Sequence, residues 1–204
     1  MLILKIKIVK IFIKNMISTS CKLFVQAELT NLAIRYQSIT LGEVELNGNL
    51  TSAQLTQLRD ALTKYGFELI EDKRTILVEK IKASIIEMVY YTEERLNTKY
   101  SYILSGKFNL NYNYLAKVFS DREGITIEKY IIFQKIERIK ELMAYGELNM
   151  TEIADKLNYS SVAHLSLQFK KNTGFTPSDY KQLKTNGRRA VEDISIARNY
   201  ALSA

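Results

Sequence analysis

The second half of the chain repeats itself with an offset of fifty residues, and this repeat restricts the fold more than any other feature. A fixed offset indicates two copies of one supersecondary unit. The first helix of the earlier copy matches less closely, because Phe108 stands one place away from the position of Leu157. The matching residues are apolar or turn-forming: Leu115 with Leu165, Phe119 with Phe169, Gly124 with Gly174, Thr126 with Thr176, Tyr130 with Tyr180, and Ile103-Leu104 with Ile153-Ala154.

The later copy indicates what the unit is. Thr151–Leu157 has the pattern of a short helix, Asn158-Tyr159 interrupts it, and Ser160 or Ser161 begins a second helix. Asn tolerates the left-handed backbone of a tight turn, and Ser is a favoured residue at a helix N-terminus. The pattern predicts a helix-turn-helix.

The second helix of each copy has an inner and an outer side. Leu165 and Phe169, like Leu115 and Phe119, stand one helical turn apart and are expected to face inward. An outer side of small and short polar residues lets a helix backbone enter a DNA major groove. The outer residues are Asn113, Ala116, Lys117 and Ser120 in the earlier copy, and Ala163, Ser166, Leu167 and Lys170 in the later one.

One helix, from about Ile127 to Tyr145, is expected between the copies. Its length of about 18 residues, at 1.5 Å rise per residue, spans about 27 Å. A strut of that length could hold two reading helices in successive major grooves, which lie about 34 Å apart. One chain would then read two adjacent half-sites.

The first 72 residues predict strands and helices in the order β-α-β-β-α-β, which closes as a small sheet with two helices on one face. The whole chain is therefore expected to be α+β. A helix from Asp72 or Lys73 to about Tyr91 would connect the halves. The expected segments are a strand from about Leu4 to Ile13, a helix from Ser18 or Thr19 to Leu32, strands at Ile34–Leu41 and Glu43–Leu46, a helix around Leu55–Leu62 and a strand at Phe67–Ile70.

The net charge and the scarcity of cysteine and histidine restrict the classes of function that the chain can have. The net charge is +7, and residues 93–189 hold 16 basic and 11 acidic side chains, which favours a polyanionic partner. Cys21 is the only cysteine and His164 the only histidine, so an all-protein zinc site, an intramolecular disulfide and most nucleophile constellations are excluded. No stretch approaches the roughly 18 apolar residues of a membrane span. We expect a cytoplasmic protein with no enzyme activity, cofactor or membrane contact.

A family resemblance rests on FKKNTGFTPSDY at Phe169–Tyr180, with Ile153-Ala154, Tyr159-Ser160-Ser161 and Leu165-Ser166. Together these residues closely resemble the DNA-binding domain of AraC/XylS-type transcriptional regulators. The likeness covers about Lys99 to Lys184 and implies two helix-turn-helix units joined by a long helix. That family usually has Arg where this chain has Leu167, which favours apolar contact with a thymine methyl group over a guanine contact.

The first half resembles the ferredoxin-like heavy-metal-associated domain over Ile11–Ile70, with NMISTSC at Asn15–Cys21. That family carries two cysteines three positions apart, and here Ser18 stands at the first position. Cys21 is thus a weak candidate ligand; a small residue at a turn is the alternative, and we assign no metal. The predicted ranges are 1–72 for this module, 73–98 for the connector, 99–185 for the DNA-binding domain and 186–204 for a basic, then polar tail.

The expected partner is double-stranded DNA, and a second copy of the chain, bound through the N-terminal module, and RNA polymerase are further candidates. The alternative is a metal-sensing or protein-interaction function of that module.

Several basic residues and the histidine have two possible roles. Lys170 and Lys171 could contact phosphate or form a solvated helix end, and His164 could pack or contact DNA. The residues that could contact DNA or remain solvated are Lys181, Lys184, Arg188 and Arg189. The expected base-reading residues are Asn113, Ala116, Lys117, Val162, Ala163, Ser166 and Leu167, and the expected phosphate contacts are Ser120, Thr151, Ser161, Lys170 and Lys171.

Overall fold

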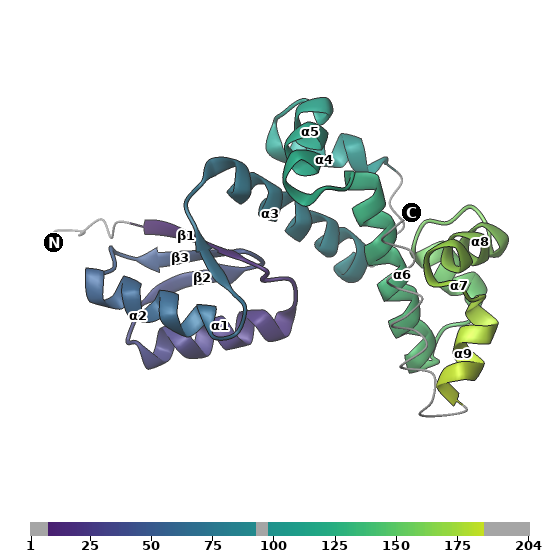
Figure 1. Ribbon diagram of the computed structural model, residues 1–204, viewed down its shortest axis with the longest axis horizontal. Helices are drawn as coiled ribbons and strands as arrows, with labels where there is room; N and C mark the ends of the chain where they lie inside the picture. Colours follow the sequence, from purple (N-terminus) through teal and green to yellow (C-terminus); the bar gives the residue numbers. More distant parts are fainter. Residues whose placement is uncertain (1–7, 93–97, 186–204) are drawn as a thin grey trace, which may run out of the picture. The chain divides into compact units, whose positions relative to one another are not determined.

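The computed structural model describes residues 8–92 and 98–185 (Figure 1). Its N-terminal part has the predicted order of elements, although the expected strand start at Leu4 lies outside the described residues. Ser18 caps the first helix, and Thr51 forms a reciprocal capping box with Gln54 at the second. The elements are β1 (Ile8–Lys14), α1 (Thr19–Asn31), β2 (Tyr36–Thr40), β3 (Glu43–Asn47), α2 (Ser52–Thr63) and β4 (Glu68–Ile70).

The four strands form one antiparallel sheet in the order β2-β3-β1-β4. Alternate residues of a strand point to the same face, and α1 and α2 cover one face of this sheet (Figure 1). The core between them contains strand residues such as Ile13 and Val44 and helix residues such as Val25 and Leu58. The first half therefore contains the small antiparallel sheet that the sequence predicts.

The opposite face of the sheet is charged. Lys10 in β1 pairs with two glutamates of β3, Glu43 and Glu45, and its Nζ lies 3.0 Å from Glu45 Oε1. Lys80, in helix α3 (Lys73–Ile86), also pairs with Glu43 at 2.9 Å, and its ammonium group lies 4.8 Å from the ring centroid of Phe12. Helix α3 therefore reaches the face of the sheet that α1 and α2 leave uncovered.

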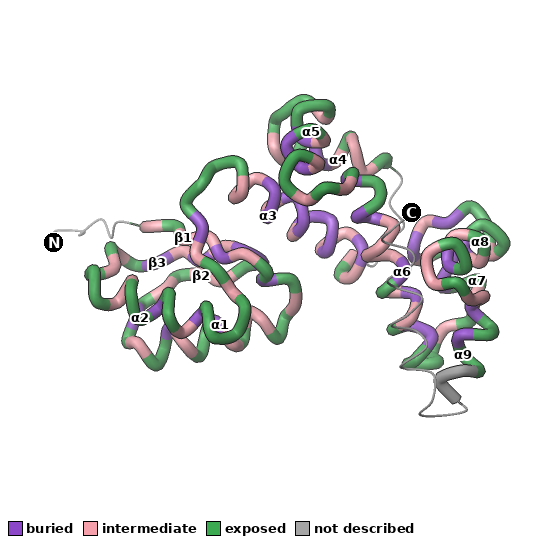
Figure 2. The backbone as a smooth tube through the Cα atoms, in the orientation of Figure 1, coloured by how far each residue is buried: buried purple, intermediate pink, exposed green. Residues whose placement is uncertain are grey.

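The rest of the described chain is helical. The helix between the repeats has its predicted bounds, whereas the predicted connector helix is divided: α3 ends at Ile86 and continues as one π-helical turn. Buried positions follow α3 along most of its length (Figure 2). None of the helices described is both long and apolar enough to cross a bilayer. The elements are η1 (Glu87–Tyr91), α4 (Tyr100–Phe108), α5 (Tyr112–Glu123), α6 (Ile127–Tyr145), α7 (Met150–Lys156), α8 (Val162–Thr173) and α9 (Pro177–Thr185).

Contacts divide the chain into two compact units. One holds the residues up to Ile86 together with Leu104–Gly124, and the other holds Glu87–Ile103 together with the residues from Ile125 onward. This division differs from the ranges predicted from the sequence because α3 packs against α5. The first reading helix, α5, thus belongs to the unit that contains the sheet, and α8 belongs to the other.

Both helix-turn-helix units contain the same turn. Asn109 and Asn158 have positive φ angles of 50° and 57°, so the predicted left-handed turn residue is confirmed and has a counterpart in the first copy. Each turn closes with one hydrogen bond reaching back three residues and one reaching back five, which is the Schellman pattern of a helix C-terminus. The bonds run from Asn109 N to Gly106 O, Leu110 N to Ser105 O, Asn158 N to Asp155 O and Tyr159 N to Ala154 O.

A difference in turn length explains the loose match in the first copy. Asn109 and Asn158 stand 49 residues apart, whereas the N-caps that follow them, Asn111 and Ser161, stand 50 apart. The first turn is one residue shorter, so the helices before the turns align with an offset of 49. The predicted pairing of Ile103-Leu104 with Ile153-Ala154 is therefore wrong by one residue. Leu104 corresponds to Ile153, and both are fully buried.

The turn geometry predicts opposite outcomes for two substitutions. Asn158→Val is expected to lower the free energy of unfolding by about 1–2 kcal/mol, because a β-branched residue is strained in the left-handed region. Asn158→Gly is expected to preserve or raise it, since Gly adopts this conformation freely. The buried Oδ1 of Asn158 also has no hydrogen-bond partner within the described chain. Chemical denaturation of the full chain measures both, and an equal loss in the two variants would mean that the amide side chain holds the turn.

Candidate nucleic-acid interface

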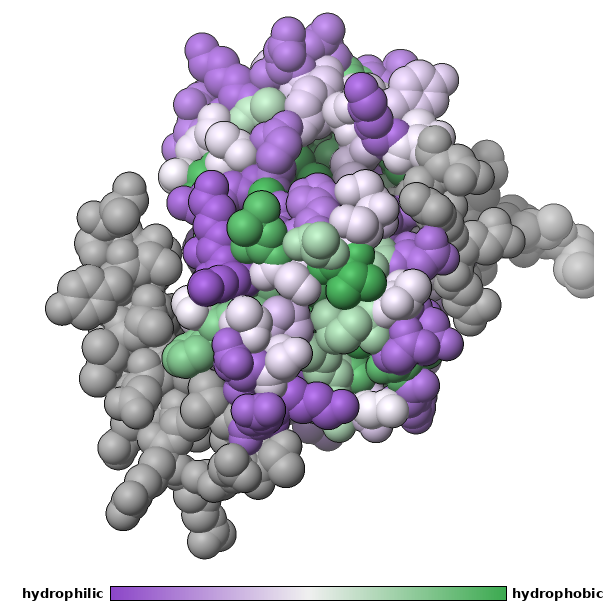
Figure 3. All heavy atoms as spheres, turned by 90° about the vertical axis from the view of Figure 1, so that its right-hand side faces the viewer, coloured by the Kyte–Doolittle hydropathy of each residue, from purple (hydrophilic) through white to green (hydrophobic). Residues whose placement is uncertain are grey.

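Helix α8 has the two sides that its sequence predicts. Leu165 and Phe169 are fully buried, and the Phe169 ring packs edge-on against Tyr180 of α9 with centroids 5.5 Å apart. On the outer side Ala163 is exposed and Leu167 is 71% exposed, while Val162 and Ser166 are partly exposed. Seen from the side of α7, α8 and α9, hydrophobic and hydrophilic side chains share this surface (Figure 3).

The N-terminus of α8 is closed by serine and histidine. Ser161 Oγ accepts a hydrogen bond from the backbone N–H of His164 (3.1 Å), which confirms Ser161 as the cap. His164 Nδ1 lies 3.1 Å from Ser160 Oγ, and its ring meets Tyr159 edge-on with centroids 5.5 Å apart. Of the two alternatives for His164, these contacts favour packing at the turn.

Helix α5, like α8, has a buried inner side and an exposed outer side, and its outer side carries more polar residues. Leu115 and Phe119 are fully buried. Asn113 and Lys117 are exposed, and Ala116 and Ser120 are partly exposed. The N-cap Asn111 accepts a hydrogen bond from Asn113 N (2.8 Å), and Ser120 Oγ donates to the Lys117 carbonyl (3.1 Å). The Asn113 side chain is thus exposed beside a cap that satisfies its backbone.

One exposed aromatic residue was missed in the sequence. Tyr114 of α5 is 47% exposed and stands three residues before Lys117, on the same side of the helix. The offset of fifty pairs Tyr114 with His164, and that correspondence was the available signal. Tyr114 adds an aromatic ring with a polar tip to the outer surface of α5.

Three of the predicted cationic contacts are exposed lysines. Lys117, Lys170 and Lys171 are exposed, and none has an ion-pair partner among the residues described. In contrast, Arg138 and Lys140 of α6 pair with Glu141 and Glu137. Thr151, at the start of α7, is exposed, and its backbone N–H donates to the N-cap Asn149 (2.9 Å). Arg188 and Arg189 lie outside the described residues.

Helices α5 and α8 belong to different compact units. The predicted reading of two successive grooves by one chain therefore stays a prediction, as do the individual base and phosphate contacts. Within each unit, the reading helix has a pair of buried apolar residues on its inner side and a strip of solvent-accessible residues on its outer side.

Lys135 of α6 lies between two tyrosine rings behind the second helix-turn-helix. Its Nζ is 4.9 Å from the ring centroid of Tyr159 and 5.5 Å from that of Tyr100. Burial lowers the pKa of Lys135 to about 8 and raises the pKa of Tyr100 to about 12. The Tyr159 hydroxyl donates to Gln168 Oε1 of α8 (2.6 Å). These residues support α8 from within the unit.

The candidate metal ligand in the first half lies beside a serine. Cys21 is partly exposed, and its Sγ lies 3.1 Å from the Oγ of Ser18, the residue at the first of the two cysteine positions of the resembled family. Among the described residues, no three His, Cys, Asp or Glu side chains gather as a metal-binding group. A metal site at Cys21 is not proposed.

Residues 104–183 match a helix-turn-helix domain. The matched segment begins at the buried Leu104, includes both reading helices, and lies within the predicted range 99–185.

The curated proteins that resemble the chain include three from Bacillus, Streptococcus and Photobacterium. An uncharacterized HTH-type transcriptional regulator, YtdP of Bacillus subtilis, is 30% identical over 81 residues, covering 40% of this chain and 10% of that protein. The Msm operon regulatory protein of Streptococcus mutans is 26% identical over 146 residues, covering 69% and 52%. LumQ of Photobacterium leiognathi, a probable transcriptional regulator, is 25% identical over 151 residues, covering 72% and 59%. The chain thus spans no more than 59% of the length of these three relatives.

The solved structures that resemble the chain include domains of two regulators. The DNA-binding domain of AdpA, a global transcriptional factor solved with a target DNA, is 16% identical, with a TM-score of 0.45 over 52% of this chain and 90% of that one. The C-terminal domain of the response regulator yesN from Fusobacterium nucleatum is 26% identical, with a TM-score of 0.43 over 50% and 98%.

The partly buried Lys135 predicts a pH-dependent stability. Its pKa is about 8 in the folded chain and 10.5 for a free side chain, so unfolding takes up a proton between these values. The free energy of unfolding should therefore rise as the pH increases from about 8 to 10.5. Lys135→Met removes this partly buried charge and is expected to raise the free energy of unfolding by about 1–3 kcal/mol near pH 7.

Urea denaturation of parent and variant across this range checks the prediction. The difference between the two proteins should shrink as the pH rises, and taking that difference removes the contribution of the tyrosines common to both. A constant difference would show that the ammonium group of Lys135 keeps its charge on folding.

Proposed function

We propose that the chain is a sequence-specific, DNA-binding transcriptional regulator of the AraC type. The observation that carries the proposal is the repeated reading helix: α5 and α8 each have a capped N-terminus, a buried inner pair and an exposed outer side. The helix-turn-helix match over residues 104–183 and the regulators among its relatives support it. We propose no catalysed reaction.

Helix α5 reads bases through polar groups. The Asn113 amide can both donate to and accept from adenine in the major groove, and the Lys117 ammonium can donate to guanine. Ala116 is small enough to let the backbone approach the bases. The exposure of Asn113 and Lys117 supports these roles.

Helix α8 reads bases through shape and apolar contact. Leu167 and Ala163 suit the methyl group of thymine, and Ser166 can hydrogen-bond to more than one base. Val162, in the first turn, completes this surface. The high exposure of Leu167 supports a role in contact with another molecule.

Phosphate contacts hold the helices in the grooves. Lys170 and Lys171 add positive charge, and Thr151 in the first turn of α7 and Ser161 at the N-cap of α8 supply hydroxyl groups near helix N-termini, with Ser120 as a further hydroxyl. Each phosphate contact releases a counterion, so specific binding should weaken steeply with added salt. Within this proposal α5 and α8 read adjacent half-sites with α6 as the spacer.

The N-terminal sheet is proposed to be a ferredoxin-like module of the heavy-metal-associated type, over residues 1–72, that serves as a scaffold. The observed β-α-β-β-α-β order and the antiparallel sheet support this assignment. A second copy of the chain and RNA polymerase are the candidate protein partners.

Lys117→Gln tests the reading role of α5. It is expected to weaken binding to a duplex selected from a random pool by about tenfold and to relax the preference at one half-site, because a base contact contributes about 1–3 kcal/mol. Lys64→Gln, an exposed lysine at the end of α2, is the matched control. Gel-shift titrations on the selected and scrambled half-sites measure the effect. An equal loss on every sequence would make Lys117 a phosphate contact.

Leu167→Arg tests the reading role of α8. Repeating the duplex selection with this variant is expected to replace thymine by guanine at one position of the other half-site, since Arg prefers the acceptors of guanine. Leu23→Arg introduces the same charge at a similarly exposed leucine on α1 and should leave the selected sequence unchanged. An identical selected sequence for parent and Leu167→Arg would remove Leu167 from the base-reading set.

A further inference from the structure

Two charged side chains of α3 are buried. Glu79 is 5% exposed and Lys82 is 8% exposed, and Lys82 Nζ lies 2.9 Å from Glu79 Oε1. Charged groups are rarely buried without partners. The other contacts of Glu79 and Lys82 therefore indicate the role of this ion pair.

Lys82 also bonds to the first reading helix. Its Nζ lies 3.5 Å from an Oε of Glu123, the last residue of α5. One ammonium group is thus shared between a carboxylate on α3 and a carboxylate on α5. The contact lies within the compact unit that contains the sheet, α3 and α5.

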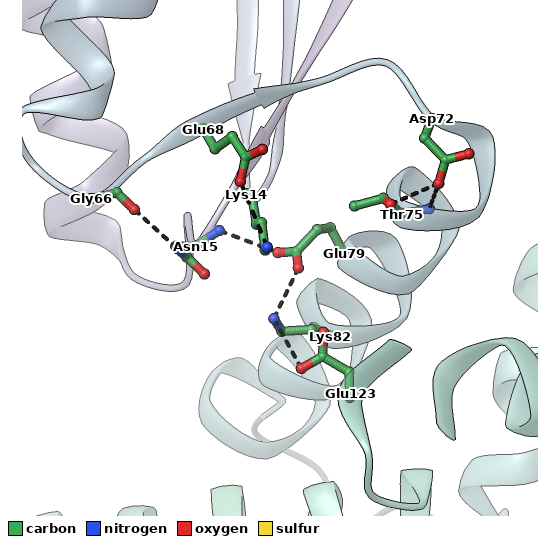
Figure 4. A network of polar contacts seen from close by, with 9 residues as sticks. All are labelled: Lys14, Asn15, Gly66, Glu68, Asp72, Thr75, Glu79, Lys82 and Glu123. Carbon is green, nitrogen blue, oxygen red and sulfur yellow. Dashed lines mark hydrogen bonds and ion pairs between the residues drawn. The ribbon is translucent and has the colours of Figure 1, made fainter. Parts of the chain in front are cut away.

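Glu79 extends the network to the sheet. Its second carboxylate oxygen accepts the backbone N–H of Asn15 (3.3 Å), the residue that follows β1 (Figure 4). Asn15 has a φ of 66°, and its side-chain amide donates to the Gly66 carbonyl (2.9 Å). A continuous set of polar contacts therefore joins the end of β1 to the end of α5.

A second, exposed contact joins the same helices. Arg122, which precedes Glu123, pairs with Asp72 at 2.8 Å, and Asp72 in turn accepts the backbone N–H of Thr75 in the first turn of α3 (2.9 Å). Of the last two residues of α5, Arg122 therefore pairs with the residue that precedes α3, and Glu123 pairs with Lys82 within α3. Replacing a buried ion pair by apolar residues is often neutral for stability, so such pairs are better explained by the geometry that they fix.

We infer that Lys82 is a positioning residue that anchors the C-terminal end of α5 to α3 and the sheet. It thereby sets the angle at which the first reading helix meets DNA. The inference rests on the proposed function, and it assigns the N-terminal module a part in the sequence preference of one half-site without any contact to a base.

The test compares Lys82→Met with Lys80→Met in the full chain. Lys80 is on the same helix and pairs with Glu43 of the sheet, so its loss removes a similar ion pair while the contact to α5 stays intact. Each variant is titrated with the selected duplex and with duplexes in which one half-site is scrambled; Lys117→Gln identifies the half-site of α5. Lys82→Met is expected to lose about tenfold in discrimination at that half-site and nothing at the other, and Lys82→Arg should restore most of it.

Hydrogen exchange of the free protein supplies an independent readout. The amides of the last turn of α5 should exchange faster in Lys82→Met than in the parent or in Lys80→Met. If Lys82→Met does not fold, the apolar double variant Glu79→Leu/Lys82→Leu replaces it and should give the same pattern.

The outcomes separate the inference from the proposed function. A parent chain that selects no DNA sequence overturns the proposed function, and the exchange data then decide whether Lys82 anchors α5. Unchanged discrimination in a folded Lys82 variant, or an equal loss at both half-sites, overturns the positioning role. Unchanged exchange in the last turn of α5 overturns the anchor itself.

Discussion

The surface that each reading helix presents depends on the packing of its inner face. Successive residues of an α-helix are about 100° apart around its axis, so a slip of one residue would turn the whole outer strip away. The buried pairs Leu115 with Phe119, and Leu165 with Phe169, prevent this rotation. The left-handed asparagines fix where each helix starts, and together these features determine which side chains can face a partner.

Local signals account for the parts of the fold that the sequence predicted. Thr51 with Gln54 and Ser161 act within one turn of the chain, and α6 begins after the cap Thr126 and ends at the left-handed Gly146. The one-residue difference between the two turns was not predicted, because residue matching at a single offset cannot detect a deletion. The π-helical turn after Ile86 has no sequence signal that we recognise.

The sequence predicts the candidate site as far as the period of an α-helix determines which side chains face outward. The outer sides of α5 and α8 follow from spacing alone, and the buried pairs confirm the rotation of both helices. Partners distant in sequence were not predictable: Lys82 meets Glu123 across 41 positions, and Lys135 reaches Tyr159 across 24. Their charge suggested exposure, and only the packing of separate helices shows that Lys82 is buried and Lys135 partly buried.

The two reading helices differ chemically although they share one framework. The outer strip of α5 carries an amide and an ammonium group at Asn113 and Lys117, whereas α8 has Ala163 and Leu167 at corresponding positions. Polar groups discriminate bases by hydrogen bonding, and apolar groups select the thymine methyl. A chain that reads with both helices would therefore recognise two unlike half-sites in a fixed order. The asymmetry of its site would then follow from one polypeptide, with no need for the two-fold symmetry that a dimer imposes.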